Sequence, residues 1–404
     1  MIRRLTLRIL ALLVGLILVE FALVLAIRDG TIFGRPLPPY GAVNNARQAE
    51  WLDRLRSDEP FQLARFDAEL GWEWVPGAVS ETGDVHLNAQ GARGTREYAA
   101  RPPTGVVRCA FFGDSFVFCD EMDDASTFEH YLEDRRSELE ALNFGVNGYG
   151  TDQALLRFRR RGRDLGAHVV WIGVLAENIG RNANRFRPFW NPRSGFAFPK
   201  PRFVLENDEL VLLPQPFADR AELARAFDDG SIVRLLSYRD HWADCPDLGA
   251  LGWSRSARLA GLPLAHHARN PLRLWGDAAG EPRRVTLALL AAFQAEALAA
   301  GAERAPVLLF PSREDLLEAQ ASGGERWAHI PSALAAASIE FVDLMEPLLE
   351  RQELLERDPT LGTLHYGGHH STIGNDVVAR TIERWLVDQR ILTPVDRGAS
   401  TNDR

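Results

Sequence analysis

The chain has 404 residues, of which 46% are hydrophobic and 25% charged, and this ordinary globular composition allows one large domain with an insertion or two domains. Its formal net charge of −9 gives no sign of the basic surface of a nucleic-acid-binding protein, so no nucleic-acid partner is expected. The cysteines Cys109, Cys119 and Cys245 cannot all pair with one another, imply no disulfide, and form no Cys-x-x-Cys metal-binding pattern.

Residues 1–28 predict a membrane anchor. From Ile9 to Ile27 the chain is apolar apart from Glu20, and these 19 residues at about 1.5 Å each nearly match a bilayer core of about 30 Å. A charged Glu20 in lipid costs on the order of 3 kcal/mol, so this side chain is expected either to be neutral or to face a partner helix. The sequence leaves both alternatives open.

The charges around this segment predict its orientation. Arg3, Arg4 and Arg8 precede it, so the positive-inside rule places the N-terminus in the cytoplasm and the rest of the chain outside, in the periplasm. A cleaved signal peptide is the alternative, because Val24-Leu25-Ala26 resembles a cleavage site. The apolar stretch is longer than an ordinary signal-peptide core, which favours an uncleaved single-pass anchor.

Residues 29–104 are expected to connect the anchor to the main domain. The juxtamembrane part, 29–60, is stiffened by the prolines of 35–39 and continues into a polar helical stretch. From 66 to 94, turn signals alternate with short apolar pieces, which predicts small strands or irregular structure.

Residues 105–390 alternate short apolar strands with helices. This alternation is typical of an α/β protein with a doubly wound parallel sheet and helices on both faces. The predicted strands are Val106–Phe112, Ala141–Val146, His168–Leu175, Val307–Phe310 and Ile339–Leu344, and the predicted helices cover Ser126–Glu140, Thr151–Arg163, Arg284–Ala300, 325–337 and Gly374–Gln389.

An insertion at 181–283 interrupts the alternation. Its stretch 201–213 predicts a β-hairpin that turns at Asn207-Asp208, and a polar tail at 391–404 is expected to be disordered. Its tryptophans could form either a sugar-stacking surface or, as is more common for this residue, part of a core; they are Trp190, Trp242, Trp253 and Trp275.

Four loops carry residues that suit acyl transfer. The first strand stops at a glycine, and Ser115 follows at its carboxyl end, where ligands bind in open α/β sheets. Gly148 follows the second strand and Asn178 the third, and each can offer an N–H donor to an oxyanion. His369 precedes the final helix, and an imidazole is the usual base for a serine nucleophile.

In this order of blocks the chain resembles the SGNH (GDSL-type) hydrolase family, over roughly 105–180 and 285–390. The matching blocks are Phe112-Gly113-Asp114-Ser115-Phe116, the stretch from Asn143 to Gln153, Asn178, and His369 five residues before Gly374. The resemblance implies a flavodoxin-like three-layer sandwich and no cofactor. It implies that Ser115 is the nucleophile, that His369 is the base, and that the Ser115 N–H, the Gly148 N–H and the Asn178 amide form the oxyanion hole.

One position departs from the family pattern. The family usually carries an aspartate three residues before the histidine, and here Tyr366 occupies that position. A main-chain carbonyl could orient His369 instead, an acid such as Asp343 or Glu346 could replace the aspartate, or the protein could be weakly active or inactive. These three explanations stay open.

Two other kinds of site compete for the same residues. His365, His369 and His370 could suggest a metal site, but the glycines between them disfavour a helix and no carboxylate lies within the cluster. The Gly145-x-x-Gly148-x-Gly150 turn does not have the glycine spacing of a nucleotide-binding loop.

The resemblance predicts a membrane-anchored extracytoplasmic serine esterase or O-acyltransferase that acts on acyl, especially acetyl, esters of carbohydrate or of a cell-surface polymer. The expected partners are therefore this ester substrate, the membrane and proteins of an envelope assembly. The alternative is a non-catalytic binding or scaffold protein of a polysaccharide assembly that keeps the fold without the reaction.

Overall fold

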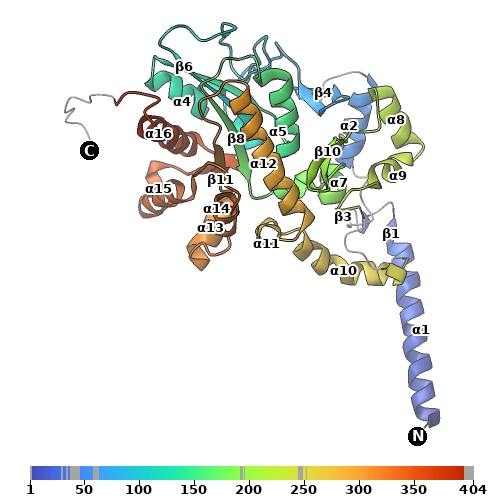
Figure 1. Ribbon diagram of the computed structural model, residues 1–404. Coiled ribbons are helices and arrows are strands. Elements are labelled where there is room, and N and C mark those ends of the chain that lie inside the picture. Colours follow the sequence, from blue (N-terminus) through green and yellow to red (C-terminus); the bar gives the residue numbers. More distant parts are fainter. Residues whose placement is uncertain are drawn as a thin grey trace. The chain divides into compact units, whose positions relative to one another are not determined.

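The computed structural model describes residues 2–28, 31–32, 35–36, 46–57, 63–191, 194, 196–243, 249–251 and 253–394 (Figure 1). The chain divides into two compact units. The first unit comprises Met1–Glu73 with Glu177–Thr286, and the second comprises Trp74–Ala176 with Leu287–Arg404. Cys245, most of the proline-stiffened connector and the tail from 395 lie outside the described residues.

The second unit is built on a parallel sheet with strand order β12-β11-β8-β6-β7. This order is that of a flavodoxin-like doubly wound sheet, so the fold class predicted from the sequence is confirmed. Its topological switch point lies at β6, where the chain order reverses. The strands are β6 (Val107–Gly113), β7 (Leu139–Gly145), β8 (Val169–Leu175), β11 (Val307–Phe310) and β12 (Phe341–Asp343).

Successive residues of β6 face opposite sides of the sheet and contact different helices. On one face, the ring of Phe111 lies 5.2 Å from that of Phe128 in α4 (Phe128–Arg135). On the other face, the ring of Phe112 lies 6.2 Å from that of Phe293 in α12 (Glu281–Ala299). Helices therefore cover both faces, as the doubly wound architecture requires.

The helices and turns differ in detail from the sequence prediction. Thr127, not Ser126, caps α4, and its side chain accepts a hydrogen bond from the His130 amide. The remaining elements of this unit are α3 (Ser115–Phe118), η1 (Asp124–Ser126), α5 (Thr151–Arg157), η2 (Phe158–Gly162), α13 (Arg313–Ser322), α14 (His329–Ala336), α15 (Met345–Arg357), η4 (Pro359–Leu361), β13 (His365–Tyr366), β14 (His369–His370) and α16 (Thr372–Asp388). Of these, α3, α13, α15 and the short strands β13 and β14 are absent from the sequence prediction.

The charged residue within the apolar run of β6 is paired across the sheet. Arg108 stands opposite Glu140 in the register of β6 and β7, and its guanidinium lies 2.7 Å from the Glu140 carboxylate. Arg108 also donates to the carbonyl of Leu165. A buried ion pair persists only when its hydrogen bonds are satisfied, so this pair fixes the register of two central strands.

The first unit holds the N-terminal helix, several short elements and the whole insertion. Its elements are α1 (Ile2–Ala26), β1 (Ile27–Arg28), β2 (Thr31–Ile32), β3 (Arg35–Pro36), α2 (Ala46–Ser57), β4 (Ala64–Asp67), most of β5 (Gly71–Trp74), α6 (Asn178–Asn182), α7 (Arg187–Trp190), β9 (Arg202–Glu206), β10 (Glu209–Leu213), α8 (Arg220–Asp228), α9 (Ser231–Ser237), η3 (Gly249–Leu251), α10 (Arg255–Ala268) and α11 (Pro271–Gly276). Strands β9 and β10 pair antiparallel, and Asn207 and Asp208 both have positive φ, which confirms the predicted hairpin.

The insertion's tryptophans do not form one exposed surface. Trp190, Trp242 and Trp275 are buried, and the indole of Trp242 donates to the Gly180 carbonyl over 2.8 Å. These three side chains belong to a core, and a sugar-stacking role for them is wrong. Trp253, in contrast, is 72% exposed.

Within the described part of the chain, α1 is the helix that is long and apolar enough to cross a membrane, over Arg4–Ala26. A signal sequence near an N-terminus meets the same criteria, so length and composition alone leave the two alternatives that the sequence raised.

Candidate active site

Ser115 is the first residue of the short helix α3, directly after the tight turn that ends β6. The Asp114 carboxylate accepts a hydrogen bond from the Phe116 amide over 3.0 Å and thereby caps α3. A Cβ on Gly113 would lie 2.5 Å from Val117, so the turn requires a glycine at that position. Ser115 is consequently held at the carboxyl end of the central strand, with 8% of its surface exposed.

The end of β7 supports the same turn from the neighbouring strand. A Cβ on Gly145 would lie 2.3 Å from the Phe118 amide nitrogen, so the two backbones are in close contact. Asn143 donates through its side-chain amide to the Val117 carbonyl over 2.7 Å. These contacts hold α3 against the sheet and leave Ser115 little freedom to move.

His369 comes from the other end of the sequence, on a two-stranded hairpin. Strands β13 and β14 pair His365 with His370 and Tyr366 with His369, and Gly367, with φ of +57°, makes the turn between them. Ser371 then caps α16 by accepting hydrogen bonds from its first amides. The imidazole packs on the ring of Phe116, with centroids 5.1 Å apart.

The structure brings Ser115 and His369 into direct contact. His369 Nε2 lies 2.8 Å from Ser115 Oγ, within the reach that proton transfer from a nucleophile needs. The predicted nucleophile and base, 254 positions apart in the chain, thus meet at one point of the second unit.

The other ring nitrogen of His369 faces Glu121. Its Nδ1 lies 3.1 Å from Glu121 Oε2, and the same oxygen accepts the Gly368 amide over 3.0 Å. An ionised carboxylate only accepts hydrogen bonds, so this contact favours a proton on Nδ1 and leaves Nε2 free to accept from Ser115. This is the tautomer in which a histidine can act as a base toward serine.

Glu121 is presented by a tightly bonded loop. The guanidinium of Arg93 donates to the carbonyls of Phe118, Cys119 and Met122, and its Nε donates to Asp124 over 3.0 Å. With 1% of its side chain exposed, Arg93 is buried and holds residues on both sides of Glu121.

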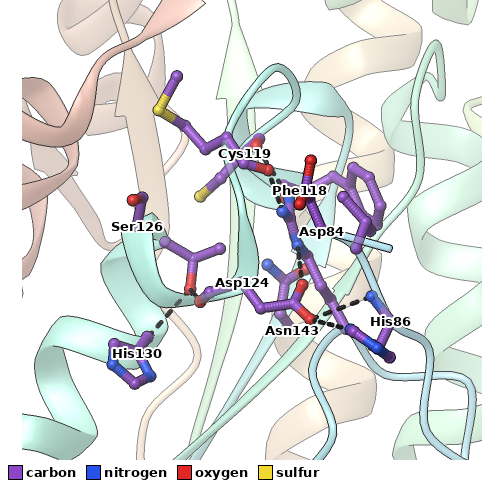
Figure 2. A network of polar contacts seen from close by, with 12 residues as sticks. Asp84, His86, Phe118, Cys119, Asp124, Ser126, His130 and Asn143 are labelled. Atoms are coloured by element: carbon purple, nitrogen blue, oxygen red, sulfur yellow. Dashed lines mark hydrogen bonds and ion pairs between the residues drawn. The ribbon is translucent and has the colours of Figure 1, made fainter. Parts of the chain in front are cut away.

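A second layer of bonds fixes Asp124 itself. Asp124 accepts from both the backbone amide and the ring Nδ1 of His86, at 3.0 and 2.9 Å (Figure 2). The Asp124 amide donates to the Asp84 carbonyl. The Glu121 loop is therefore tied to the segment that precedes β6, which supports the site from outside the Ser115–His369 contact.

Two more histidines lie on the same hairpin, His370 buried and His365 half-buried. Burial, together with the nearby His365, lowers the pKa of His370 to about 3. Burial also lowers the pKa of His365 to about 4, helped by the nearby charge of Arg313. Both rings are consequently neutral near pH 7 and serve as packing groups.

Gly148 and Asn178, the predicted oxyanion donors, have different settings. Gly148 follows β7 with φ of +80°, three residues beyond the Gly113–Gly145 pair that joins the ends of β6 and β7. It therefore lies at the same edge of the sheet as Ser115. Asn178 follows β8 and opens α6, but it belongs to the first unit, so its role at the oxyanion stays a prediction.

The sequence-based candidates for the orienting acid have other partners. Asp343 accepts hydrogen bonds from the Trp327 indole and the Met345 amide. Glu346 is exposed, and Tyr366, which occupies the family's acid position, is 63% exposed. The side chain at His369 Nδ1 is instead Glu121, which the sequence analysis missed.

The sequence carries only a weak signal for Glu121. It stands six residues after Ser115 in a run with Asp120, Asp123 and Asp124, and nothing in the spacing distinguishes one acid from the next. Its φ of +69° is the feature that sets it apart, and a left-handed glutamate is not predictable from residue type.

Comparison with known proteins yields structural likenesses alone: no protein-family model and no curated protein matches the chain. One similar structure is described as a lipolytic protein of the G-D-S-L family from Desulfitobacterium hafniense, 11% identical, with 69% of this chain and 98% of that one covered and a TM-score of 0.33. An acetyl xylan esterase is 12% identical, covers 69% and 100%, and has a TM-score of 0.34. A lipase/acylhydrolase from Enterococcus faecalis is 11% identical, covers 70% and 97%, and has a TM-score of 0.34. Similarity at this level assigns no activity to the chain, whose chemistry has to be argued from its own residues.

Proposed function

We propose that this protein is a serine ester hydrolase or O-acyltransferase of SGNH type in which Ser115, His369 and Glu121 act together. The observation that carries the proposal is the 2.8 Å contact between Ser115 Oγ and His369 Nε2. Buried serines and histidines are common separately, but a hydroxyl and an imidazole in hydrogen-bond contact, with a carboxylate on the far ring nitrogen, form the arrangement that activates a serine.

In the proposed reaction, Ser115 Oγ attacks the carbonyl carbon of an ester while its proton passes to His369 Nε2. Glu121 stabilises the resulting imidazolium through Nδ1, as the acid of a catalytic triad does. Collapse of the tetrahedral intermediate breaks the bond to the alcohol oxygen, which takes the proton from Nε2. Water, or the hydroxyl of an acceptor, then attacks the acyl-enzyme by the same route in reverse.

Charge that develops on the carbonyl oxygen needs fixed donors. The amide of Ser115 stands in the first turn of α3, where amides have no partner within the helix. Gly148 N–H and the Asn178 amide are proposed as the other two donors. Removal of one such donor from an oxyanion hole costs roughly 10²–10³ in turnover.

The substrate and location belong to the same proposal. We place the catalytic unit outside the cytoplasm, tethered by α1, and infer an O-acyl ester of a carbohydrate or cell-surface polymer as substrate. Hydrolysis and transfer use identical residues here and differ only in the acceptor.

The test is active-site labelling of the full chain in detergent with a fluorophosphonate, together with hydrolysis of p-nitrophenyl acetate. Ser115→Ala is expected to abolish labelling and to lower kcat by about 10⁴-fold or more. The exposed Ser332→Ala in α14 is the matched control and should retain both activities.

Two results would overturn the proposal. Wild-type protein that is well folded yet neither labels nor turns over would favour the non-catalytic scaffold. Labelling that persists in Ser115→Ala would place the nucleophile elsewhere.

A further inference from the structure

The carboxylate of Glu20, inside the apolar helix α1, is bound by the start of helix α10. Glu20 Oε2 accepts from the Ser254 hydroxyl at 3.0 Å and from the hydroxyl and amide of Ser256 at 2.8 and 3.1 Å. Glu20 Oε1 accepts from the amide of Arg255. Both helices belong to the first unit, and Figure 1 shows α10 beside the C-terminal part of α1.

These bonds show how a glutamate is accommodated within an apolar span. Two amides at a helix N-terminus and two hydroxyls supply four donors, and the positive end of the helix dipole adds to their attraction for the carboxylate. Of the two alternatives drawn from the sequence, the structure matches the one in which Glu20 faces a partner helix. The partner is a helix of the same chain.

The position of Glu20 determines the depth of α10 in any bilayer that α1 crosses. Glu20 lies six residues before the end of the candidate span at Ala26, which is about 9 Å along a helix. Interfacial helices bury their apolar face about 5–10 Å into the boundary between headgroups and acyl chains. The first turn of α10 would therefore stand at the depth of an interfacial helix.

The side chains around α10 suit that depth. Leu251, Trp253 and Leu264 are 59%, 72% and 62% exposed, respectively, and so present apolar surface from both ends of the segment. Tryptophan is enriched at the level of the headgroups. Residues 249–270 contain three arginines and no acid, whereas the whole chain carries a net charge of −9, so this segment complements an anionic lipid surface.

We propose that α10 and the flanking residues Gly249–Leu251 and Trp253 lie in the interfacial layer of the bilayer, on the side where α1 ends, and that Glu20 holds them there. The bilayer is the partner of this surface. Helix α1 is then a retained part of the folded first unit, because cleavage after Ala26 would remove the carboxylate that caps α10.

The test uses the full chain in vesicles of phosphatidylethanolamine and phosphatidylglycerol, with Cys245→Ser and a fluorescent NBD label on Leu264→Cys or Trp253→Cys. Cys109 and Cys119 are buried, so they do not compete for the label. The emission of both labels is expected to be quenched by lipids with a nitroxide near the headgroup about threefold more than that of Asp208→Cys, at the exposed turn of the β9–β10 hairpin. Equal quenching at all three positions would overturn the proposal.

A second variant separates the contact between Glu20 and α10 from the insertion of α1 into the membrane. Glu20→Leu removes the carboxylate but keeps α1 apolar, so the protein should stay in the membrane after alkaline carbonate extraction while quenching at Leu264→Cys falls to the Asp208→Cys level. Val19→Leu, one position away, is the control and should change neither result.

Three further outcomes would contradict the proposal. The first is an unchanged label signal in Glu20→Leu, and the second is a mature N-terminus just after Ala26. The third is burial of the label, seen as a change in its emission, that occurs only when a second copy of the chain or another protein is added.

Discussion

Two segments of the second unit supply His369 and its Nδ1 partner Glu121, and they are anchored in different ways. The loop from Phe118 to Asp124 is gripped by Arg93, whose guanidinium reaches three carbonyls and one carboxylate. The hairpin that carries His369 consists of two paired positions in each strand and a two-glycine turn.

The hairpin takes part of its position from the loop. The Gly368 amide and the His369 ring both donate to Glu121 Oε2, so one carboxylate orients the imidazole and holds the turn beside it. A Cβ on Gly367 would lie 2.2 Å from Glu121 Oε1, which shows how closely the two segments approach. Glu121 is therefore held by its own loop, and His369 takes its position from its contact with Glu121.

The largest expected effect of breaking this arrangement is that of Glu121→Gln. The amide keeps the shape but removes the charge that stabilises the imidazolium and selects its tautomer, so kcat should fall about 10³-fold with KM within about twofold. Hydrolysis of p-nitrophenyl acetate measures both constants. Asp120→Asn, at the adjacent acid, is the control.

Chemical rescue distinguishes this orienting role from a merely structural one. Glu121→Ala leaves a partly open position, because the side chain is 35% exposed, and added formate should restore about tenfold of the lost rate. Full activity of Glu121→Gln, with Ser115→Ala still inactive, would refute the role of Glu121 while leaving the proposed reaction intact.

Arg93→Lys tests the fixed segment from a distance. An ammonium cannot reach the four acceptors of the planar guanidinium, so the free energy of unfolding should fall by about 3 kcal/mol and kcat by about tenfold as Glu121 loses its support. Urea denaturation and steady-state kinetics check the two effects. Arg96→Lys, at a half-exposed ion pair, should change either one far less; comparable losses in both variants would contradict this role of Arg93.

The hairpin that carries His369 is expected to lose stability as the pH falls. The pKa of His370 is about 3 in the folded protein, against 6.5 for an ordinary histidine, so the unfolded chain binds the extra proton as the pH falls below 6.5. Stability is thus greatest above pH 6.5 and declines toward pH 3. His370→Phe should remove about 2 to 3 kcal/mol of the loss between pH 7.5 and 4.5, measured by denaturation at both values.

The control for the loss of one histidine is His329→Gln, at an exposed position in α14. An unchanged pH dependence in His370→Phe would show that protonation of this ring does not limit the stability of the hairpin.

The smallest effect is expected at the position where the family pattern places the acid. Tyr366→Asp restores that residue type, but His369 Nδ1 is already bonded to Glu121, so kcat/KM should change by less than about twofold. A gain of tenfold or more would mean that Glu121 orients the imidazole poorly.

Much of the fold can be predicted from local pattern. Five short apolar strands alternating with helices are enough to predict the doubly wound sheet, because each strand is buried and bounded by turn residues. The missed helix α13 has a usable signal, since Ser312 and Asp315 form a reciprocal cap at its start. The predicted helix begins at Ser126, whereas Thr127 is the observed cap of α4, because propensity does not separate neighbouring hydroxyl residues.

The candidate site likewise contains residues that local sequence pattern predicts and one that it does not. Ser115, Gly148, Asn178 and His369 follow strand ends or precede a helix, and such boundaries are visible in a sequence. Glu121 stands at no such boundary. Its role depends on a left-handed backbone and on Arg93, a residue 28 positions earlier, and neither a φ value nor a tertiary hydrogen bond is encoded in residue spacing.

The proposed nucleophile and acid share one short stretch of chain, six residues from Ser115 to Glu121, while the proposed base comes from a remote hairpin. Under this proposal, Tyr366 is no sign of lost activity, because Glu121 supplies the carboxylate that the SGNH pattern places three residues before the histidine. A search for SGNH-like sequences that requires this aspartate would overlook such a chain, and an acid shortly after the Gly-Asp-Ser turn is the feature that would recover it.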